Sequence, residues 1–315
     1  MVIDRPWSIQ IELTEGCSRL CSFCGLNGIV AHRGKTPRFM TVETADRLSR
    51  MCADYIPDRR YEFAMHGEPT INPNYLEILE MFRSRLPKAQ IQVTTNGYSM
   101  LLLGSSAIDA MFLAGIDFIV LDTYKPERDT LLSIVKDTNY TLITDCGKVS
   151  PYANHHRKVK NTIFIMDDLG EVSGQKRNRV IFNHGGNALS QPVPAQPLKA
   201  MCTNVFREIS VAYDGDVSAC CMDFGHELVV GSVIKQTLKE VWDGPEFLAI
   251  RRMLYAKQRH VTPCLRCNYP GGMRQGLIEN PGPYTERDQD IVRTVFNRSI
   301  TFTKRNNLKP EIREI

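Results

Sequence analysis

Residues 7–24 are WSIQIELTEGCSRLCSFC, and this stretch decides both the fold class and the chemistry that we expect. In residues 7–14 apolar and polar side chains alternate, which is the pattern of a β-strand. Three cysteines, Cys17, Cys21 and Cys24, follow that strand within eight residues. In proteins built from alternating strands and helices, functional loops lie at the carboxyl ends of the strands. We therefore expect a metal or cofactor site in the loop that begins after residue 14.

Strand and helix patterns continue to alternate up to about residue 170. About six strand–helix units in a row imply a parallel sheet with helices packed against it. Six units fill only part of a barrel, so we predict an α/β fold with a partial (β/α)6 barrel. The predicted strands cover residues 7–14, 61–65, 91–95, 116–121, 141–144 and 162–166, and the predicted helices cover residues 41–55, 74–86, 105–114 and 127–136.

The composition is that of an ordinary globular protein, since 43% of the 315 residues are hydrophobic and 23% are charged. A net charge of +4 does not by itself favour a polyanionic partner. No apolar run reaches the length of about 18 residues that a membrane helix needs. The first residues, MVIDRPW, lack the pattern of a signal peptide. We therefore expect a cytoplasmic protein that does not enter a membrane.

Ten cysteines in a chain without an export signal are more often metal ligands than disulfides, because the compartment is reducing. Seven of them fall into two clusters, whereas Cys52 and Cys146 are interpreted as small buried hydrophobic side chains. Three thiolates on one loop can hold three irons of a four-iron, four-sulfur (4Fe-4S) cluster, which leaves the fourth iron open to a ligand. A zinc site completed by His32 or His66 is the alternative.

Two further turns follow predicted strands and favour the iron–sulfur interpretation. Residues 65–70 are MHGEPT and residues 94–97 are TTNG. Together with CxxxCxxC after the first strand and Phe23 before the third cysteine, these turns resemble the motifs of radical S-adenosylmethionine (SAM) enzymes. The chain departs from that pattern at His66, where the family has the first glycine of a Gly-Gly-Glu-Pro turn. Since the turn is expected to act mainly through backbone groups, the departure is a minor one.

The resemblance implies that Cys17, Cys21 and Cys24 hold a 4Fe-4S cluster whose open iron binds SAM. An electron from a reductant such as flavodoxin or ferredoxin would then cleave SAM to methionine and a 5′-deoxyadenosyl radical, which removes a hydrogen atom from substrate carbon. Asp122 stands where the family often has a ribose-binding residue, although a turn residue at a strand end is an equal alternative. The residues implied in SAM binding are Phe23, which would stack on the adenine, Gly67, Glu68 and Pro69 near the amino group, Thr95 and Asn96 near the ribose or carboxylate, and His66 and Asp122.

A second group of cysteines follows at a longer spacing, with Gly215 between its first two members. Four thiolates close a metal site completely, which suits either zinc or a fully ligated four-iron cluster. The pattern resembles the auxiliary-cluster domain of radical SAM enzymes in its short form, called twitch and related to the longer SPASM domain. The resemblance implies one auxiliary 4Fe-4S cluster, with Cys221 turned away because neighbouring strand residues face opposite sides. The four implied ligands are Cys202, Cys220, Cys264 and Cys267.

Changes in pattern divide the chain into four predicted segments. A hairpin with Asp-Gly at its turn and a helix over residues 237–255 are predicted in the third segment. His184, in the glycine-rich sequence NHGGN, is a candidate substrate contact, with an ordinary surface turn as the alternative. The last segment is polar and basic, and we expect it to be partly mobile. The segments are a radical SAM partial barrel at 1–170, a connector at 171–199, a small C-terminal auxiliary-cluster domain at 200–275 and a tail at 276–315.

Two classes of function fit these features. The first is an oxygen-sensitive enzyme that uses SAM and two iron–sulfur clusters, and the second is a zinc-binding structural protein. The two turns at residues 65–70 and 94–97 favour the enzyme, because a structural zinc protein does not need them. Oxidation (dehydrogenation) of a small molecule is the favoured reaction, and radical modification or rearrangement of a peptide, nucleoside or nucleic acid is the alternative. Tyr124, Asp122, His184 and Arg207 are candidates for an acid or base by position only.

Overall fold

The structure, a computed structural model, describes residues 4–34, 36–125, 127–144, 159–166, 182–271 and 278–305. Some predicted features fall elsewhere and are not tested by it. Cys146, the expected strand near Val180 and the last ten residues of the tail lie outside the described residues, as does the side chain of His32.

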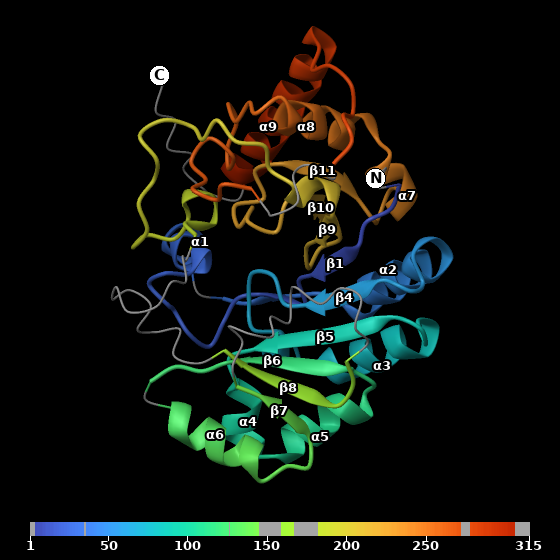
Figure 1. Ribbon diagram of the computed structural model, residues 1–315, viewed down its shortest axis with the longest axis vertical. Coiled ribbons are helices and arrows are strands. Elements are labelled where there is room, and N and C mark those ends of the chain that lie inside the picture. Colours follow the sequence, from blue (N-terminus) through green and yellow to red (C-terminus); the bar gives the residue numbers. More distant parts are fainter. Residues whose placement is uncertain are drawn as a thin grey trace.

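In the described part of the chain, nine strands form one sheet that does not close on itself (Figure 1). Seven neighbouring strands are parallel, and β10 and β11 continue the sheet in antiparallel pairing. This open, mostly parallel sheet confirms the predicted α/β class. Its order is β11 (Val229–Ser232), β10 (Asp216–Ser218), β9 (Glu208–Val211), β1 (Ser8–Ile11), β4 (Arg60–Phe63), β5 (Gln90–Thr95), β6 (Phe118–Asp122), β8 (Thr162–Met166) and β7 (Thr141–Ile143).

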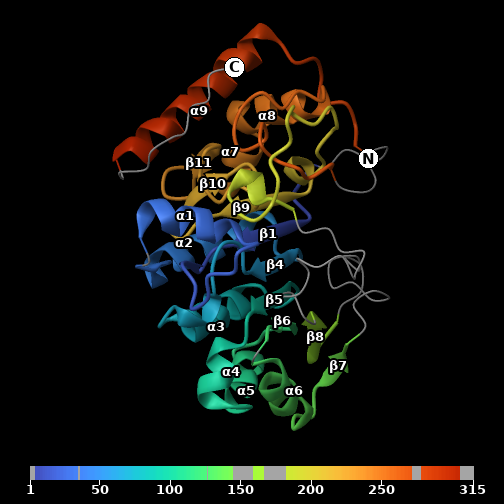
Figure 2. The same cartoon turned by 90° about the vertical axis from the view of Figure 1, so that its left-hand side faces the viewer.

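Helices are distributed along both halves of the sheet, with α4, α5 and α6 near β7 and with α7, α8 and α9 near β11 (Figures 1 and 2). The predicted helix over 41–55 is confirmed, and the Thr41 hydroxyl caps it by accepting from the amide of Thr44 at 3.1 Å. The helices are α1 (Gly25–Arg33), α2 (Val42–Tyr55), α3 (Tyr75–Arg85), α4 (Tyr98–Leu103), α5 (Ser106–Leu113), α6 (Arg128–Lys136), α7 (Leu238–Trp242), α8 (Pro245–Tyr255) and α9 (Glu286–Arg305), with 3₁₀ turns η1 (Pro69–Ile71), η3 (His184–Gly186) and η4 (Asn204–Phe206). A small second sheet pairs β2 (Thr14–Glu15) with β3 (Arg38–Phe39).

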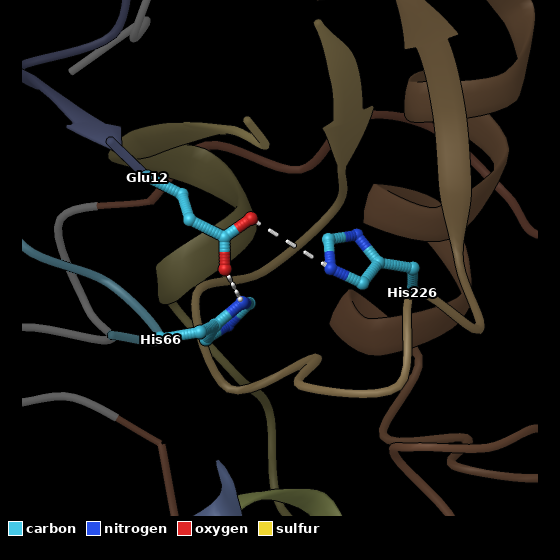
Figure 3. A group of neighbouring side chains, drawn as sticks. All are labelled: Glu12, His66 and His226. Carbon is cyan, nitrogen blue, oxygen red and sulfur yellow. Dashed lines mark hydrogen bonds and ion pairs between the residues drawn. The ribbon is translucent and has the colours of Figure 1, made fainter. Parts of the chain in front are cut away.

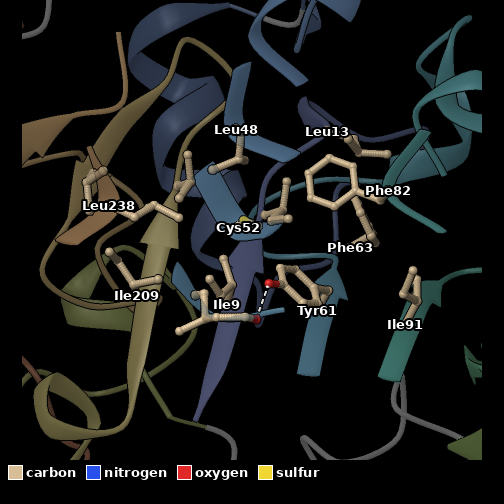
Figure 4. Close-up of a cluster of buried hydrophobic side chains, with 14 of the residues drawn as sticks. Ile9, Leu13, Leu48, Cys52, Tyr61, Phe63, Phe82, Ile91, Ile209 and Leu238 are labelled. Atoms are coloured by element: carbon tan, nitrogen blue, oxygen red, sulfur yellow. Dashed lines mark hydrogen bonds between the residues drawn. The ribbon is translucent and has the colours of Figure 1, made fainter. Parts of the chain in front are cut away.

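The first and third predicted segments share one sheet and one core. Strand β9 pairs in parallel with β1, so that Ile9 lies beside Ile209. Both side chains are fully buried, in a cluster that also contains Tyr61 and Leu238 (Figure 4). Cys52 lies in the same cluster and is fully buried, as expected of a small hydrophobic residue. Because the sheet is continuous, β1 brings the first cysteine loop and the second group of cysteines to neighbouring positions.

Three local features differ from the sequence-based expectations. Strand β8 lies between β6 and β7, so the last two strands of the barrel are not in chain order. The predicted helix over 237–255 is two helices, because Gly244 and Pro245 separate α7 from α8 and proline cannot donate the amide that a helix interior needs. Helices α1 and α4, which were not predicted, begin directly after Cys24 and Gly97.

The basic tail, which we expected to be partly mobile, contains the 20-residue helix α9. It packs against α8 through Val292 and Val295, which are 0% and 1% exposed. Asp288 caps its first turn by accepting from the amide of Thr285, and it pairs with Arg252 of α8 at 3.0 Å. Val292 and Val295, three positions apart, form a narrow apolar stripe along α9. The mostly polar composition of the tail did not reveal this stripe in the sequence. Among the described residues, no helix has both the length and the apolar character required to cross a bilayer.

Candidate functional site

The first three cysteines lie on a loop between β2 and α1. The amide of Cys24 donates to the carbonyl oxygen of Cys21 at 2.9 Å, and Cys24 is the N-cap residue of α1. All three thiols are half-buried. Burial, with a smaller contribution from the neighbouring cysteines, raises the pKa of Cys17 to about 11 and that of Cys24 to about 12. Thiolates that are unfavourable alone become stable when they bind a metal centre, so this donor set fits an iron–sulfur cluster.

The carboxylate of Glu68 joins the turn after β4 to the turn after β5. Its Oε1 accepts from the hydroxyls of Thr70 at 2.6 Å and Thr95 at 2.7 Å, and from the amide of Thr70 at 3.1 Å. Its Oε2 accepts from the amide of Asn96 at 2.8 Å. Burial raises the pKa of Glu68, and these hydrogen bonds oppose that rise. Because the carboxylate is already engaged by the chain, only backbone groups of this turn remain to meet a SAM amino group.

Gly67 is required by a close approach of two backbone segments. A Cβ at this position would lie 2.1 Å from the carbonyl oxygen of Thr14 and 2.3 Å from that of Gly16. The next amide, that of Glu68, donates to the Gly16 oxygen at 2.8 Å. The Gly-Glu-Pro turn is therefore pressed against the segment that leads into the cysteine loop, and any larger residue at position 67 would separate them.

Asn96 connects the Thr-Asn-Gly turn to the same loop. Its Nδ2 donates to the sulfur of Cys17 at 3.2 Å and to the hydroxyl of Ser18 at 3.3 Å. Its Oδ1 accepts from the amide of Tyr98 at 3.0 Å. The structure thus brings Cys17, Glu68, Thr95 and Asn96 together, as the sequence predicts, and it shows that their first contacts are with one another.

Asp122 ends β6 on the same side of the sheet and is partly exposed. Burial, followed by the charge of Glu68, raises its pKa to about 7. Phe23 lies nearby in a parallel stack with Tyr124, with ring centroids 6.3 Å apart. The guanidinium of Arg19 covers the Tyr124 ring at 4.7 Å and pairs with Glu127 at 3.0 Å. Tyr124 was a candidate by position only. Its ring stacks on one face of Phe23, so the opposite face of Phe23 is the one that can stack on an adenine.

His66 has a different place from the one expected of a SAM contact. Its Nε2–H donates to the carbonyl oxygen of Cys221 at 2.9 Å, and its Nδ1 lies 3.0 Å from Oε1 of Glu12 (Figure 3). Both side chains are buried. With both ring nitrogens bound to the chain, His66 faces the second group of cysteines and leaves no nitrogen for SAM.

The second group of cysteines gathers between η4, β10 and the loop after α8. Cys202 and Cys267 are buried, and Cys220 and Cys264 are half-buried. Burial, followed by the charge of Cys220 and, less strongly, of Cys267, raises the pKa of Cys202 to about 12. Cys264 lies in the field of the other three thiols, which add to the effect of burial on its pKa. The four thiols therefore lie within range of one another's charge, which fits a fully ligated cluster. The carboxylate of Glu208 lies within 4.8 Å of the Cys220 sulfur.

Backbone amides surround these sulfurs. The amide of Met222 donates to the sulfur of Cys220 at 3.3 Å, and the amide of Tyr269 donates to that of Cys267 at 3.4 Å. The Cys221 thiol donates to Glu208 at 2.9 Å, and its sulfur lies within 4.8 Å of the Cys220 sulfur. The expectation that Cys221 is turned away from its neighbour is therefore wrong, because β10 ends before these two residues and strand alternation does not apply to them.

The described end of the connector links the two cysteine groups. Nδ1 of His184 accepts from the amide of Gly25, the residue after Cys24, at 2.8 Å. Asn183 exchanges backbone and side-chain hydrogen bonds with Asn268, the residue after Cys267, at 2.7 and 3.1 Å. His184, a candidate substrate contact, is therefore a half-buried hydrogen-bond acceptor for the start of α1. A sequence alone does not reveal this, because Gly25 and His184 are 159 positions apart.

A cavity of about 190 Å³ lies beside the first cysteine loop. Its walls include Cys17 and Ser18 of the loop and apolar side chains of α1. Among the described residues, this cavity leaves room for a small molecule next to the predicted cluster.

Comparisons with known proteins match this arrangement. Residues 11–143 match the radical SAM superfamily, and residues 202–268 match the SPASM iron–sulfur cluster-binding domain. The S-adenosyl-L-methionine-dependent 2-deoxy-scyllo-inosamine dehydrogenase of Niallia circulans is 20% identical over 276 residues, which are 84% of this chain and 94% of that protein. A GTP 3′,8-cyclase of Pasteurella multocida (strain Pm70) is 28% identical over 96 residues, which are 30% of this chain and 28% of that protein.

Solved structures show the same fold. The crystal structure of BtrN in complex with AdoMet and 2-DOIA superposes with a TM-score of 0.65 at 19% identity, over 84% of this chain and 94% of that one. The structure of anSMEcpe with bound AdoMet gives a TM-score of 0.50 at 14% identity, over 96% of each chain. These superpositions confirm the predicted α/β fold class.

Proposed function

This chain is a radical SAM enzyme with a SPASM iron–sulfur domain, and we propose that it dehydrogenates an alcohol carbon of a small molecule. The observation that carries the proposal is the second group of cysteines, which supplies four thiolates to one site. A fully ligated cluster has no vacant iron for a substrate, so it suits electron transfer. Similarity to a dehydrogenase along 84% of the chain supports the same reaction class.

We assign Cys17, Cys21 and Cys24 to the SAM-binding cluster. Cys202, Cys220, Cys264 and Cys267 are assigned to the auxiliary cluster. When bound, the first cluster and SAM supply the radical chemistry that removes a hydrogen atom from carbon. A flavodoxin or ferredoxin is the proposed reductant, and the cytoplasm is the proposed location.

The residues of the chain itself position the cofactor. Gly67 lets the turn after β4 approach the cysteine loop, and Glu68 holds that turn against Thr95 and Asn96. We propose that the backbone of this turn accepts from the SAM amino group, that Asp122 accepts from a ribose hydroxyl and that Phe23 stacks on the adenine.

The number of electrons that leave the substrate in an oxidation fits an enzyme with a second cluster. Conversion of an alcohol to a ketone removes two electrons and two protons from the substrate. Abstraction of the hydrogen atom takes one electron and one proton, and the hydroxyl proton leaves to a base. The remaining electron needs an acceptor within the enzyme, which a cluster held by the four thiolates would supply.

The test uses enzyme that is purified and reconstituted without oxygen. It is supplied with SAM, a low-potential reductant and a panel of cyclitols and aminocyclitols, and products are measured by mass spectrometry. We expect 5′-deoxyadenosine and a product two mass units lighter than its substrate, in about equal amounts. Formation of 5′-deoxyadenosine together with a product of unchanged mass would replace the oxidation by a rearrangement. Turnover of peptides or nucleosides but not of cyclitols would reject the small alcohol substrate.

A further inference from the structure

The peptide that follows Cys221 connects His66 to a sulfur of the auxiliary site. The carbonyl oxygen of Cys221 accepts from Nε2 of His66 at 2.9 Å. The amide of the same peptide unit belongs to Met222 and donates to the sulfur of Cys220 at 3.3 Å. A donor at one end of a peptide polarises it and strengthens the hydrogen bond at the other end. His66 therefore acts on Cys220 through a single peptide.

We propose that His66, held as an imidazolium by Glu12, is a positioning residue that sets the reduction potential of the auxiliary cluster through the Cys221–Met222 peptide. The inference depends on the proposed function, because it assumes that Cys220 is a cluster ligand. Hydrogen bonds to cluster sulfurs and nearby positive charge raise the reduction potential of iron–sulfur clusters. Such a rise would favour transfer of an electron from the substrate to the auxiliary cluster.

The partners of His66 require two ring protons. The carbonyl oxygen of Cys221 accepts only, and the ionised carboxylate of Glu12 also accepts only. Glu12 is 0% exposed and His66 is 2% exposed, so water does not supply alternative partners. The second oxygen of Glu12 accepts from the amide of Tyr213 at 3.2 Å, which further favours its ionised form.

The groups around the pair also favour a protonated His66 and an ionised Glu12. Attraction to Glu12 raises the pKa of His66 against the effect of burial, and attraction to His66 and His226 lowers that of Glu12. Asp223 also faces His66 and raises its pKa. The Phe224 ring packs 4.2 Å from the imidazole on one side. A buried pair of this kind is stable only when both members stay charged.

A metal ion is the other occupant to consider, because Glu12, His66 and His226 place ligand atoms within 4.8 Å of one another. The observations favour the hydrogen-bonded pair. Nδ1 of His66 and Oε1 of Glu12 are 3.0 Å apart, which is a direct hydrogen-bond distance with no ion between them. Metal binding is therefore an outcome of the test.

Glu12→Gln is the informative variant, because its geometry is nearly unchanged. The glutamine oxygen can accept from Tyr213, and its amide can donate to Nδ1 of a neutral His66 whose Nε2–H still bonds Cys221. His66→Gly removes the charge and the hydrogen bond together and restores the residue of the family motif. Asp117→Asn is the control, since Asp117 is a buried carboxylate that pairs with Arg83 at 2.6 Å before the start of β6, at the end of the sheet opposite the cysteine turns.

The experiment measures the midpoint potential of the auxiliary cluster by redox titration with electron paramagnetic resonance, in full-length reconstituted enzyme. We expect Glu12→Gln to lower the reduction equilibrium about tenfold, which is about 59 mV for a one-electron couple. His66→Gly should lower it at least as far, and Asp117→Asn should leave it unchanged.

Potentials in both test variants equal to that of the wild type would overturn the proposal. One equivalent of zinc or manganese per chain that is lost on His226→Gln would also overturn it, in favour of a metal site. Failure of the proposed oxidation in the product assay leaves these potentials unaffected, so the two ideas fail separately.

Discussion

Oε1 of Glu68 lies 2.7 Å from the hydroxyl of Thr95, and this hydrogen bond ties two strand-end turns into one surface beside the cysteine loop. The turns belong to neighbouring parallel strands, β4 and β5. The turn at residues 65–70 is expected to act mainly through its backbone groups. Here its position depends on the buried carboxylate of Glu68. Several expected results follow from this and from the other contacts of the site.

Glu68→Gln should weaken SAM binding about tenfold, a loss of about 1.4 kcal/mol. The amide replaces one carboxylate oxygen by a donor, which then faces the amide of Asn96 or the hydroxyls of Thr70 and Thr95. An unsatisfied buried donor costs about 1–3 kcal/mol, so the unfolding midpoint should also fall. The KM for SAM and thermal unfolding of the reconstituted enzyme measure the two effects.

Thr95→Val should weaken SAM binding less than Glu68→Gln does, because it removes only the hydroxyl that donates to Glu68. Thr94→Val is the matched control. Thr94 is the neighbouring strand residue and its hydroxyl accepts from Gln92 at 2.8 Å, away from Glu68. Equal KM values for SAM in the two valine variants would contradict the role given to the Glu68–Thr95 contact.

Removal of either cysteine group should leave about half of the iron. We expect about eight irons and eight sulfides per chain in the wild type and about four in the Cys17→Ala, Cys21→Ala, Cys24→Ala variant. That variant should form no 5′-deoxyadenosine, whereas Cys264→Ala with Cys267→Ala should still cleave SAM but form no oxidised product. Zinc without sulfide in the wild type would instead support a structural metal protein.

His184 should make the enzyme less stable in mild acid. Burial, followed by the charge of His66, lowers the pKa of His184 to about 4 from an ordinary value of 6.5. The unfolded chain therefore binds a proton before the folded one does, and stability falls as the pH drops from about 6.5 towards 4. The expected loss between pH 7.5 and pH 5.5 is about 1 kcal/mol.

His184→Asn should reduce that loss while keeping a side-chain acceptor. His184 has a φ of 48°, a left-handed conformation that asparagine tolerates well. Unfolding midpoints at the two pH values, measured without oxygen, give the comparison. A variant that loses as much stability as the wild type would show that other groups cause the acid sensitivity.

Val292→Ala should destabilise the enzyme by about 1–3 kcal/mol, because a fully buried side chain leaves a cavity between α8 and α9. Thr294→Ala, an exposed substitution on the same helix, should change stability by less than about 0.5 kcal/mol. Thermal unfolding of both variants decides whether α9 is an integral part of the fold. Equal midpoints would mean that the helix contributes little.

Sequence reasoning was most successful where the signal is local. The cysteine spacings, the MHGEPT and TTNG turns and the alternation of strands and helices predicted the family, the cofactors and the α/β class, which the comparisons confirm. It failed for α9, whose two buried valines are hidden in a polar tail, and for the order of β7 and β8. Local pattern does not determine which strand inserts beside which, because strand order is decided by packing of the whole sheet.

By itself the sequence determined which groups can hold the first metal centre, because Cys17, Cys21 and Cys24 lie on one short loop, and family resemblance indicated the ligands of the second. Only the tertiary structure decided how the two centres communicate. His66 meets Cys221 across 155 positions and Gly25 meets His184 across 159, through contacts created when β9 joined the sheet beside β1. The physical reason is that ligand spacing is a property of a few linked residues, whereas the charge of a buried side chain depends on every group that folding brings against it.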